Sequence, residues 1–467
     1  MNKKIDILKK LKRYFDAEFI VTENRALTFK KFAEFAFSLS LTYKNFGVSA
    51  GDVIAVSFKN SYFQSLHILS LFLYGAIPFS LSQEWLEKNS ESNMMKKVKF
   101  ILSDDEELYC LKIINIDLAI SGHDIWKRKK TNLNQPVSII LTSGSSGVPK
   151  GIVHSLKNHY YSALGSSENI SFAEGDRWLL SLPLYHISGL SILFRSLFAG
   201  GSVFIPEKNN NLPELLIKRK ITHVSLVPTQ LNKLIEDDYF IENISRLSLK
   251  TILVGGDKIP EWLLKRTIDL NLPIHISYGS SEMSSQIATT KKLSSYTLPL
   301  TCGTPLKYRK LCIDKKGGIK VGGKTLFYAQ FNEFGIKKNR NKWFSSGDLG
   351  TYLNGEILIK GRKDNMFICG GKNIHPELIE NELEKIPGIQ KAIVIPQNDL
   401  FLGKVPIAFV KTDGNFLLEE EKINALLGRA LGKFFIPKSY YQMPAQFYSN
   451  NKINRNAILK YFESEIS

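Results

Sequence analysis

The chain has 467 residues, of which 43% are hydrophobic, and a formal net charge of +18 at pH 7. This length and composition predict a globular protein of about two to four domains, and they exclude a disordered chain. No stretch approaches the roughly twenty apolar residues of a membrane span, so we expect no integral membrane segment.

The basic balance attracts anions in general, but the lysine runs do not interleave with aromatic residues on a recognisable nucleic-acid module. We therefore expect no nucleic acid partner. The first residues, MNKKIDILKKLKRYF, lack the apolar core of a secretory signal and predict an amphipathic helix. Four cysteines without a CxxC pair or metal spacing predict reduced thiols and a cytoplasmic location: Cys110, Cys302, Cys312 and Cys369. The sequence leaves a homo-oligomer open.

Short apolar runs alternate with helical stretches through the first part of the chain. Strands are predicted at 53–58, 137–141, 178–182, 202–205, 223–227, 251–254 and 273–277, and helices at 65–74, 190–197, 230–235 and 261–268. This alternation predicts an α/β fold of layered, mostly parallel sheets covered by helices, with ligands at the carboxyl ends of the strands.

The character of the sequence changes beyond about residue 300. Short strands separated by glycine turns, at 311–313, 318–321 and 356–359, predict a small β-rich subdomain. A separate α+β unit then follows, with helices at 376–384 and 419–431 and strands at 391–395 and 406–411. We expect an N-terminal domain over 1–361 and a small, mobile C-terminal domain over 362–467.

The run LTSGSSGVPKG, from Leu141 to Gly151, follows one of the predicted strands. Glycines let backbone N–H groups curl around an anion, hydroxyls add donors, and Lys150 adds a positive charge. The run is not a Walker A loop, because Pro149 precedes the lysine and Gly151 follows it. It predicts a polyphosphate-binding loop, and the alternative is a flexible surface loop.

Four further motifs follow in order, namely SYGSSE (277–282), SSGDLG (345–350), GRKDNMFICGGKNIHPELIE (361–380) and NNKINR (450–455). With the glycine-rich run, this series resembles the signature of the acyl-adenylate-forming superfamily over nearly the whole chain. The resemblance implies an ATP-dependent acid–thiol ligase that uses ATP, Mg²⁺ and coenzyme A with a small carboxylic acid. A carboxylate attacks the α-phosphate to give an acyl-adenylate and pyrophosphate, and a thiol then displaces AMP, so charge stabilisation at phosphorus is the main task.

The resemblance also assigns roles by motif. Lys452 would bridge the substrate carboxylate and the α-phosphate, Glu282 would bind Mg²⁺, and Asp364 would be the hinge of the small domain. The nucleotide and coenzyme positions are the phosphate loop (Thr142, Ser143, Gly144, Ser145, Ser146, Gly147 and Lys150), the adenine side (Gly255, Gly256 and Tyr278, with Gly279 and Ser281), the ribose side (Asp348 and Arg362), and Gly370 and Gly371 for the pantetheine arm.

Several of these positions have ordinary structural alternatives. Taken alone, Lys452 is a solvated surface residue, Asp348 a turn residue and Glu282 a helix cap. Departures from the superfamily pattern are mild, since Ser281 and Ser346 keep the hydroxyl of the usual threonine. All the charged catalytic positions remain, and we expect an active enzyme.

Within the superfamily, HISGLSILFR (186–195) and SQIATT (285–290) resemble the o-succinylbenzoate–CoA ligases of menaquinone biosynthesis. On a helix Ser188, Ser191 and Arg195 share one face, where serine and arginine suit a second carboxylate. His186 is expected near the reacting carboxylate, with a core histidine as the alternative; weaker pocket candidates are Gln286, Thr289 and Thr290.

The sequence is also compatible with other functions. Arg195 has a purely structural pairing as its alternative. The rival activities are an aryl-CoA ligase of the benzoate or halobenzoate type, a carrier-loading adenylation domain, and a basic nucleotide- or nucleic-acid-binding protein without catalysis. Salt-sensitive nucleic acid binding without ATP–pyrophosphate exchange would identify the last of these.

Overall fold

Two mixed sheets form the framework of the N-terminal part in the computed structural model, which describes residues 4–104, 131–142, 149–207, 211–295, 299–412, 419–447 and 455–466. The first sheet has the order β20 (Gly335–Lys338), β19 (Ala329–Asn332), β9 (Lys150–Ser155), β8 (Pro136–Thr142), β5 (Ile77–Ser80), β4 (Val53–Ser57) and β6 (Phe100–Ser103). Strands β4, β5, β6 and β8 are parallel, whereas β9 runs antiparallel to β8 and β19 antiparallel to β9.

The second sheet has the order β16 (Thr304–Pro305), β15 (Ser285–Thr289), β14 (Ile274–Ser280), β13 (Thr251–Gly255), β12 (His223–Leu226), β10 (Arg177–Leu179), β11 (Ser202–Phe204), β2 (Glu18–Val21) and β3 (Ala26–Thr28). It is parallel from β14 to β2 and antiparallel at its ends. The prediction of layered, mostly parallel sheets is therefore confirmed.

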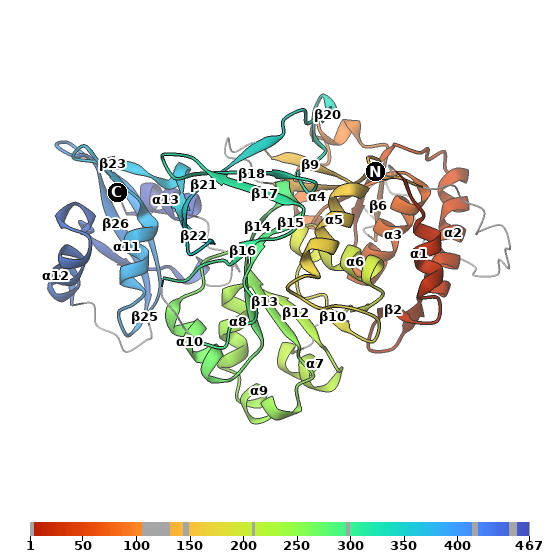
Figure 1. The fold of residues 1–467 in the computed structure, drawn as a ribbon. Coiled ribbons are helices and arrows are strands. Elements are labelled where there is room, and N and C mark those ends of the chain that lie inside the picture. The colour runs from red at the N-terminus through yellow and green to blue at the C-terminus, as the bar shows by residue number, and fades with distance from the viewer. Residues whose placement is uncertain are drawn as a thin grey trace.

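Helices fill the space between these sheets: α2 (Phe29–Asn45), α3 (Ser61–Tyr74), α5 (Leu156–Ser166) and α6 (Ile187–Ala199) (Figure 1). One core cluster joins Val56 and Ile140 of the first sheet, Trp178 and Val203 of the second, and side chains of the helices. Because α3 is buried on most sides, it is apolar nearly all round. It begins earlier than predicted because the side chain of Asn60 accepts from the N–H of Tyr62.

A second core covers the other face of the larger sheet, under α7 (Leu212–Lys218), α8 (Pro228–Ile235), α9 (Asp238–Glu242) and α10 (Glu261–Asp269). Peripheral elements are α1 (Ile7–Arg13), α4 (Gln83–Asn89), β1 (Lys4–Ile5) and β7 (Thr131–Asn132). The first helix is shorter than predicted, because Ile5 pairs in β1. The β-rich subdomain is an antiparallel sheet of β17 (Arg309–Ile313), β18 (Gly318–Gly323), β21 (Trp343–Leu353) and β22 (Glu356–Arg362).

The small C-terminal part gathers at one end of the molecule (Figure 1). Its elements are β23 (Phe367–Cys369), β24 (Lys372–Ile374), α11 (Pro376–Leu383), β25 (Ile389–Asp399), β26 (Gly403–Thr412), α12 (Glu420–Ala430), β27 (Tyr440–Gln442) and α13 (Arg455–Glu465). Alternate residues of β25 and β26 pack against α11 and α12 on one face and α13 on the other. These two cores contain only residues beyond 366, and the other clusters only residues up to 359.

Two sequence expectations concern composition. Cys302, Cys312 and Cys369 are free thiols, and Cys110 lies outside the described residues. None of the described helices is long and apolar enough to cross a membrane.

Candidate active site

The two ends of the predicted phosphate loop lie on neighbouring antiparallel strands. Strand β8 ends at Thr142, strand β9 begins at Lys150, and the two residues stand opposite each other in the register. The hydroxyl of Thr142 donates to the carbonyl oxygen of Lys150 at 3.4 Å. The intervening candidates Ser143, Gly144, Ser145, Ser146 and Gly147 lie outside the described residues, so the structure places only the two ends of the loop.

A connected cluster joins three predicted nucleotide residues. The hydroxyl of Tyr278 donates to Asp348 Oδ2 at 2.5 Å, and Arg362 Nη1 donates to Asp348 Oδ1 at 2.9 Å. Pairing of β21 with β22 sets Asp348 opposite Arg362. Burial, assisted by the charge of Asp348, raises the pKa of Tyr278 well above its usual value, so the phenol stays a neutral donor. The sequence motifs thus converge in space.

Two of the predicted glycines are required by close backbone packing. A Cβ at Gly255 would lie 2.8 Å from the carbonyl oxygen of Ser277, and one at Gly279 would lie 2.3 Å from that of Ser285. Gly256 has φ +88°, which side chains rarely adopt. Close strand packing therefore accounts for Gly255 and Gly279, and the backbone conformation accounts for Gly256, without reference to a ligand.

The predicted magnesium ligand, Glu282, lies in a short 3₁₀ turn with Ser281. Its carbonyl oxygen accepts from the N–H of Phe327 at 2.8 Å, while the carbonyl of Ser281 accepts from His154 Nε2 at 2.7 Å. Burial lowers the pKa of His154 to about 4, so a neutral ring holds this turn. No sequence signal pointed to His154. Among the described residues no group of three or more His, Cys, Asp or Glu side chains could hold a metal ion, and a single carboxylate suits Mg²⁺ that arrives with phosphate oxygens.

Helix α6 carries the predicted acid-binding face. Arg195 is only 4% exposed, and its Nη2 donates to Gln286 Oε1 at 2.8 Å and to Ser285 Oγ at 3.3 Å. Its guanidinium lies 4.9 Å from the centre of the Trp178 ring. Ser191 Oγ approaches Ser285 Oγ at 3.3 Å. The structure therefore unites the predicted Ser191, Arg195 and Gln286, and adds Ser285.

Arg195 is a buried cation whose hydrogen-bond acceptors are all neutral. Burial lowers its pKa to about 10, so it remains charged at neutral pH. Among the described residues no carboxylate forms an ion pair with it, and its Nε has no hydrogen-bond partner. A buried charge without a counter-ion is costly, and such a group is a ready receptor for an anion.

A second buried arginine, Arg309, supports this face. Its five hydrogen bonds all go to uncharged acceptors, among them the carbonyl oxygen of Gln286 at 2.9 Å and Ser162 Oγ at 3.1 Å. Gln286 is held further by Ser166 Oγ at 2.7 Å and by Thr289 Oγ1 at 2.8 Å. Arg309 lies outside every motif, and no sequence signal identified it.

The remaining candidates lie at the margins of this network. Ser188 is half-buried, and its carbonyl accepts from Ser191 Oγ at 3.0 Å. His186 is exposed at the residue preceding α6, which excludes a core histidine, and its ring centre lies 4.7 Å from that of Tyr185. The hydroxyl of Thr290 accepts from the N–H of Ile276 at 2.9 Å, which ties it to the sheet.

Four predicted positions belong to the predicted small domain or its boundary. Asp364 accepts from Arg362 Nη2 at 3.2 Å. Gly370 and Gly371 form the turn between β23 and β24, with φ of +53° and +79°. Lys452 lies outside the described residues.

Comparisons with known proteins agree with this arrangement. Residues 8–324 match the family model described as AMP-binding enzyme. The 2-succinylbenzoate–CoA ligase of Haemophilus influenzae is 34% identical over 333 residues, covering 71% of this chain and 72% of that protein. The enzyme of the same name from Geobacillus sp. is 30% identical over 464 residues, covering 94% and 92%.

Solved structures match over nearly the whole chain. The R195K variant of E. coli MenE with bound OSB-AMS has a TM-score of 0.82 at 25% identity, covering 99% of both chains. The o-succinylbenzoate coenzyme A synthetase (MenE) of Bacillus subtilis in complex with ATP and magnesium ion has a TM-score of 0.76 at 25% identity, covering 96% and 98%. The same enzyme with its product analogue OSB-NCoA, as a double mutant, has a TM-score of 0.64 at 26% identity, covering 97% and 98%. The chain therefore belongs to the AMP-binding, acyl-adenylate-forming enzymes, as an AMP-forming acid–thiol ligase of the 2-succinylbenzoate–CoA ligase family.

Proposed function

We propose that this enzyme activates o-succinylbenzoate as an acyl-adenylate and transfers the acyl group to coenzyme A in menaquinone biosynthesis. The observation that carries the substrate assignment is Arg195, a buried cation whose partners are all neutral. o-Succinylbenzoate has two carboxylates. The succinyl carboxylate reacts with ATP, and the aryl carboxylate remains to supply the missing counter-ion.

This assignment separates the substrate from its nearest rivals. Benzoate and halobenzoates have one carboxylate, which the reaction consumes, so they would leave Arg195 buried and uncompensated. Ser191, Ser285 and Gln286 add hydroxyl and amide groups around the guanidinium. Thr289 positions Gln286, and His186 with Ser188 precedes this face at the start of α6.

The adenylation step depends on charge stabilisation at phosphorus. The loop from Thr142 to Lys150 would hold the β- and γ-phosphates, Lys452 would bridge the carboxylate and the α-phosphate, and Glu282 would hold Mg²⁺. Magnesium neutralises phosphate charge when it is bound. Tyr278 lies on the adenine side, while Asp348 accepts the ribose hydroxyls and Arg362 orients it through the 2.9 Å contact.

The thioester step requires a change of domain arrangement. The division at 361/362 agrees with the separation of the hydrophobic cores, and Asp364 follows it directly. Rotation about Asp364 withdraws Lys452 and brings Gly370 and Gly371 to the pantetheine arm of coenzyme A. We place the reaction in the cytoplasm, where thiols such as Cys302 and Cys369 stay reduced.

A coupled AMP-release assay with coenzyme A tests the substrate. With coenzyme A as the acceptor, we expect AMP release with o-succinylbenzoate and at most weak release with benzoate or 4-chlorobenzoate as the acid. With o-succinylbenzoate as the acid, we expect at most weak release when a phosphopantetheinyl carrier protein replaces coenzyme A. Equal kcat/KM for benzoate and o-succinylbenzoate would refute the assignment.

The half-reactions test Lys452 separately. Lys452→Ala should abolish pyrophosphate release from ATP while preserving thioester formation from the preformed acyl-adenylate. Loss of both half-reactions to the same extent would remove its assigned role.

A further inference from the structure

A polar pocket lies at the opposite end of β9 from the phosphate loop. Its volume is about 360 Å³, which is within the usual range of small-molecule sites. Lys150 begins β9 and Ser155, which lines the pocket, ends it. Six residues of extended strand separate these ends by roughly 17 Å, so the pocket is distinct from the predicted nucleotide site.

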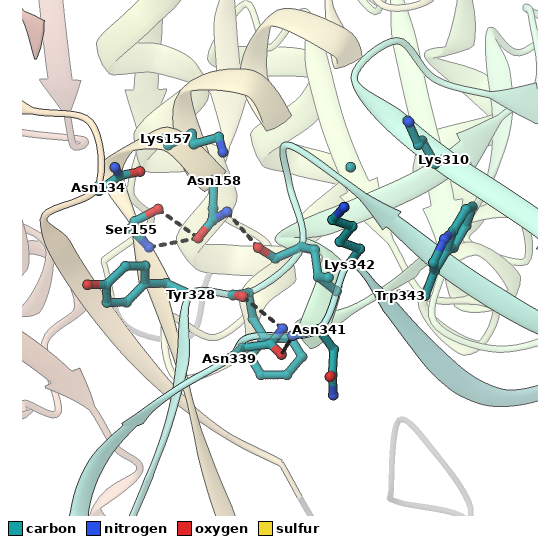
Figure 2. A pocket seen from close by; sticks show the side chains of 13 residues that line it. Asn134, Ser155, Lys157, Asn158, Lys310, Tyr328, Asn339, Asn341, Lys342 and Trp343 are labelled. Carbon is teal, nitrogen blue, oxygen red and sulfur yellow. Dashed lines mark hydrogen bonds between the residues drawn. The ribbon is translucent and has the colours of Figure 1, made fainter. Parts of the chain in front are cut away.

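Three lysines from separate elements line this pocket, namely Lys157 of α5, Lys310 of β17, and Lys342 next to β21 (Figure 2). None of the thirteen lining residues is acidic. Among the residues that the structure describes, no carboxylate forms an ion pair with any of the three lysines. The pocket thus carries three uncompensated positive charges.

The other polar lining groups are mainly amides. Asn134, Asn339 and Asn341 join the lysines, and the exposed ring of Trp343 forms one side beside Lys310 (Figure 2). Amides supply donors for phosphate oxygens, and an indole face accepts a planar ring or a methylene chain. The N–H groups of Leu156 and Lys157 already donate to backbone carbonyls, so the lysines carry the charge of the site.

Hydrogen bonds hold the wall of the pocket in place. Asn158 is buried and accepts from the N–H of Ser155 (Figure 2), while its amide donates to the carbonyls of Lys324 and Leu326 at 3.0 and 2.8 Å. The next residue, Phe327, donates its N–H to the carbonyl of Glu282. A preformed wall lowers the entropic cost of binding, and this wall is tied to the turn that carries the predicted magnesium ligand.

We propose that this pocket binds the phosphate groups of a small molecule, at a site separate from the one that binds ATP for adenylation. Charge-assisted hydrogen bonds from the three lysines would hold the phosphate oxygens. A pocket of this volume suits a small phosphorylated compound. Two sources of the same chemistry are a free polyphosphate and a nucleotide whose base lies on Trp343.

Isothermal titration calorimetry of the whole enzyme with inorganic pyrophosphate and, separately, ADP tests the proposal, with the acyl-adenylate site filled by OSB-AMS. The variant Lys157→Gln/Lys310→Gln/Lys342→Gln should lose one class of binding site, with affinity lowered at least about 100-fold. The matched control Lys30→Gln/Lys44→Gln/Lys265→Gln removes the same charge from exposed lysines on α2 and α10 and should keep that site.

Coincident isotherms for the wild type and the pocket variant would overturn the proposal, as would equal loss in the control. If pyrophosphate binding is lost only in the pocket variant, the proposal is supported and phosphate groups alone are sufficient for binding. If ADP binds more tightly than pyrophosphate, and Trp343→Ala lowers the affinity for ADP to that for pyrophosphate, the proposal is supported with a nucleotide as the ligand. An unchanged kcat of the pocket variant with o-succinylbenzoate would show that this site is separate from the catalytic one.

Discussion

Two arginines, the partly buried Arg455 of the C-terminal part and the buried Arg195 of the N-terminal part, have opposite surroundings. Arg455 at the start of α13 donates to both oxygens of Glu380, at 2.8 and 3.1 Å, and lies 3.8 Å from Glu377. Arg195 on α6 contacts only hydroxyl, amide and aromatic groups. The first charge is neutralised within the fold, whereas the second awaits a counter-ion from outside.

This difference distinguishes a structural cation from a receptor. Removing one partner of a buried ion pair leaves the other uncompensated, which destabilises a fold strongly. Removing a buried cation that has no counter-ion relieves the fold of a desolvated charge, while any anionic ligand loses its partner. The arginines should therefore respond to the same substitution in opposite ways, in stability and in activity.

Arg455→Met should give the largest change in stability. The free energy of unfolding of the small domain should fall by about 3–5 kcal/mol, because Glu380 stays buried without its partner. Hydrogen exchange of the β25 and β26 amides measures this. The exposed control Arg429→Met should change it by less than about 0.5 kcal/mol, and equal effects of the two variants would contradict the structural role.

Arg195→Met should give the largest change in activity with the least loss of stability. We expect kcat/KM for o-succinylbenzoate to fall about 100-fold, or about 2.7 kcal/mol, with KM for ATP unchanged. Urea unfolding should show equal or higher stability. Arg177→Met, on neighbouring β10, removes a partly exposed ion pair with Glu18 and is the control. Unaltered kcat/KM would exclude Arg195 from the acid pocket.

Arg309→Lys tests whether the charge of Arg309 or its hydrogen-bond geometry supports acid binding beside Arg195. Lysine keeps the charge but loses the planar fork that holds the carbonyl oxygens of Gln286 and Ser162. We expect KM for o-succinylbenzoate to rise about tenfold, or about 1.4 kcal/mol, with kcat retained. A fall in kcat with no change in KM would show that Arg309 does not position the acid-binding face.

Two buried histidines differ from both arginines, because burial leaves their rings neutral. Burial lowers the pKa of His67 and His154 to about 4, below their usual 6.5. The unfolded chain takes up these protons first, so stability is full above pH 6.5 and is lost toward pH 4. Protonation of each histidine in the unfolded chain should therefore lower the free energy of unfolding by about 1.4 kcal/mol at pH 5.5 relative to pH 8. Urea unfolding of His67→Gln should show that its free energy of unfolding depends less steeply on pH than that of the wild type. An identical dependence would contradict the lowered pKa of His67.

Much of the fold follows from local sequence. Alternating apolar strands and amphipathic helices predicted the layered domain, and the predicted strand at 251–254 corresponds to β13 (Thr251–Gly255). Extents differ where neighbours extend an element, as in β26, which is ten residues long because it pairs with β25 along its length. Strand order and the antiparallel β8–β9 hairpin depend on partners distant in sequence, which local patterns do not specify.

The candidate site divides in the same way. Helical spacing alone placed Ser191 and Arg195 on one face, and motif order indicated that Tyr278, Asp348 and Arg362 serve one ligand. Backbone register then brought Asp348 and Arg362 together. His154 and Arg309 escaped prediction because their significance comes from contacts with Ser281 and Gln286, each more than twenty residues away in sequence.

Local sequence is sufficient to indicate the class of chemistry, because phosphate loops and adenylate motifs are local arrangements of glycine, hydroxyl and charge. Which charges stay uncompensated depends instead on the folded structure. Whether an arginine is paired like Arg455 or unpaired like Arg195 depends on which distant carboxylates the fold brings within about 4 Å of it.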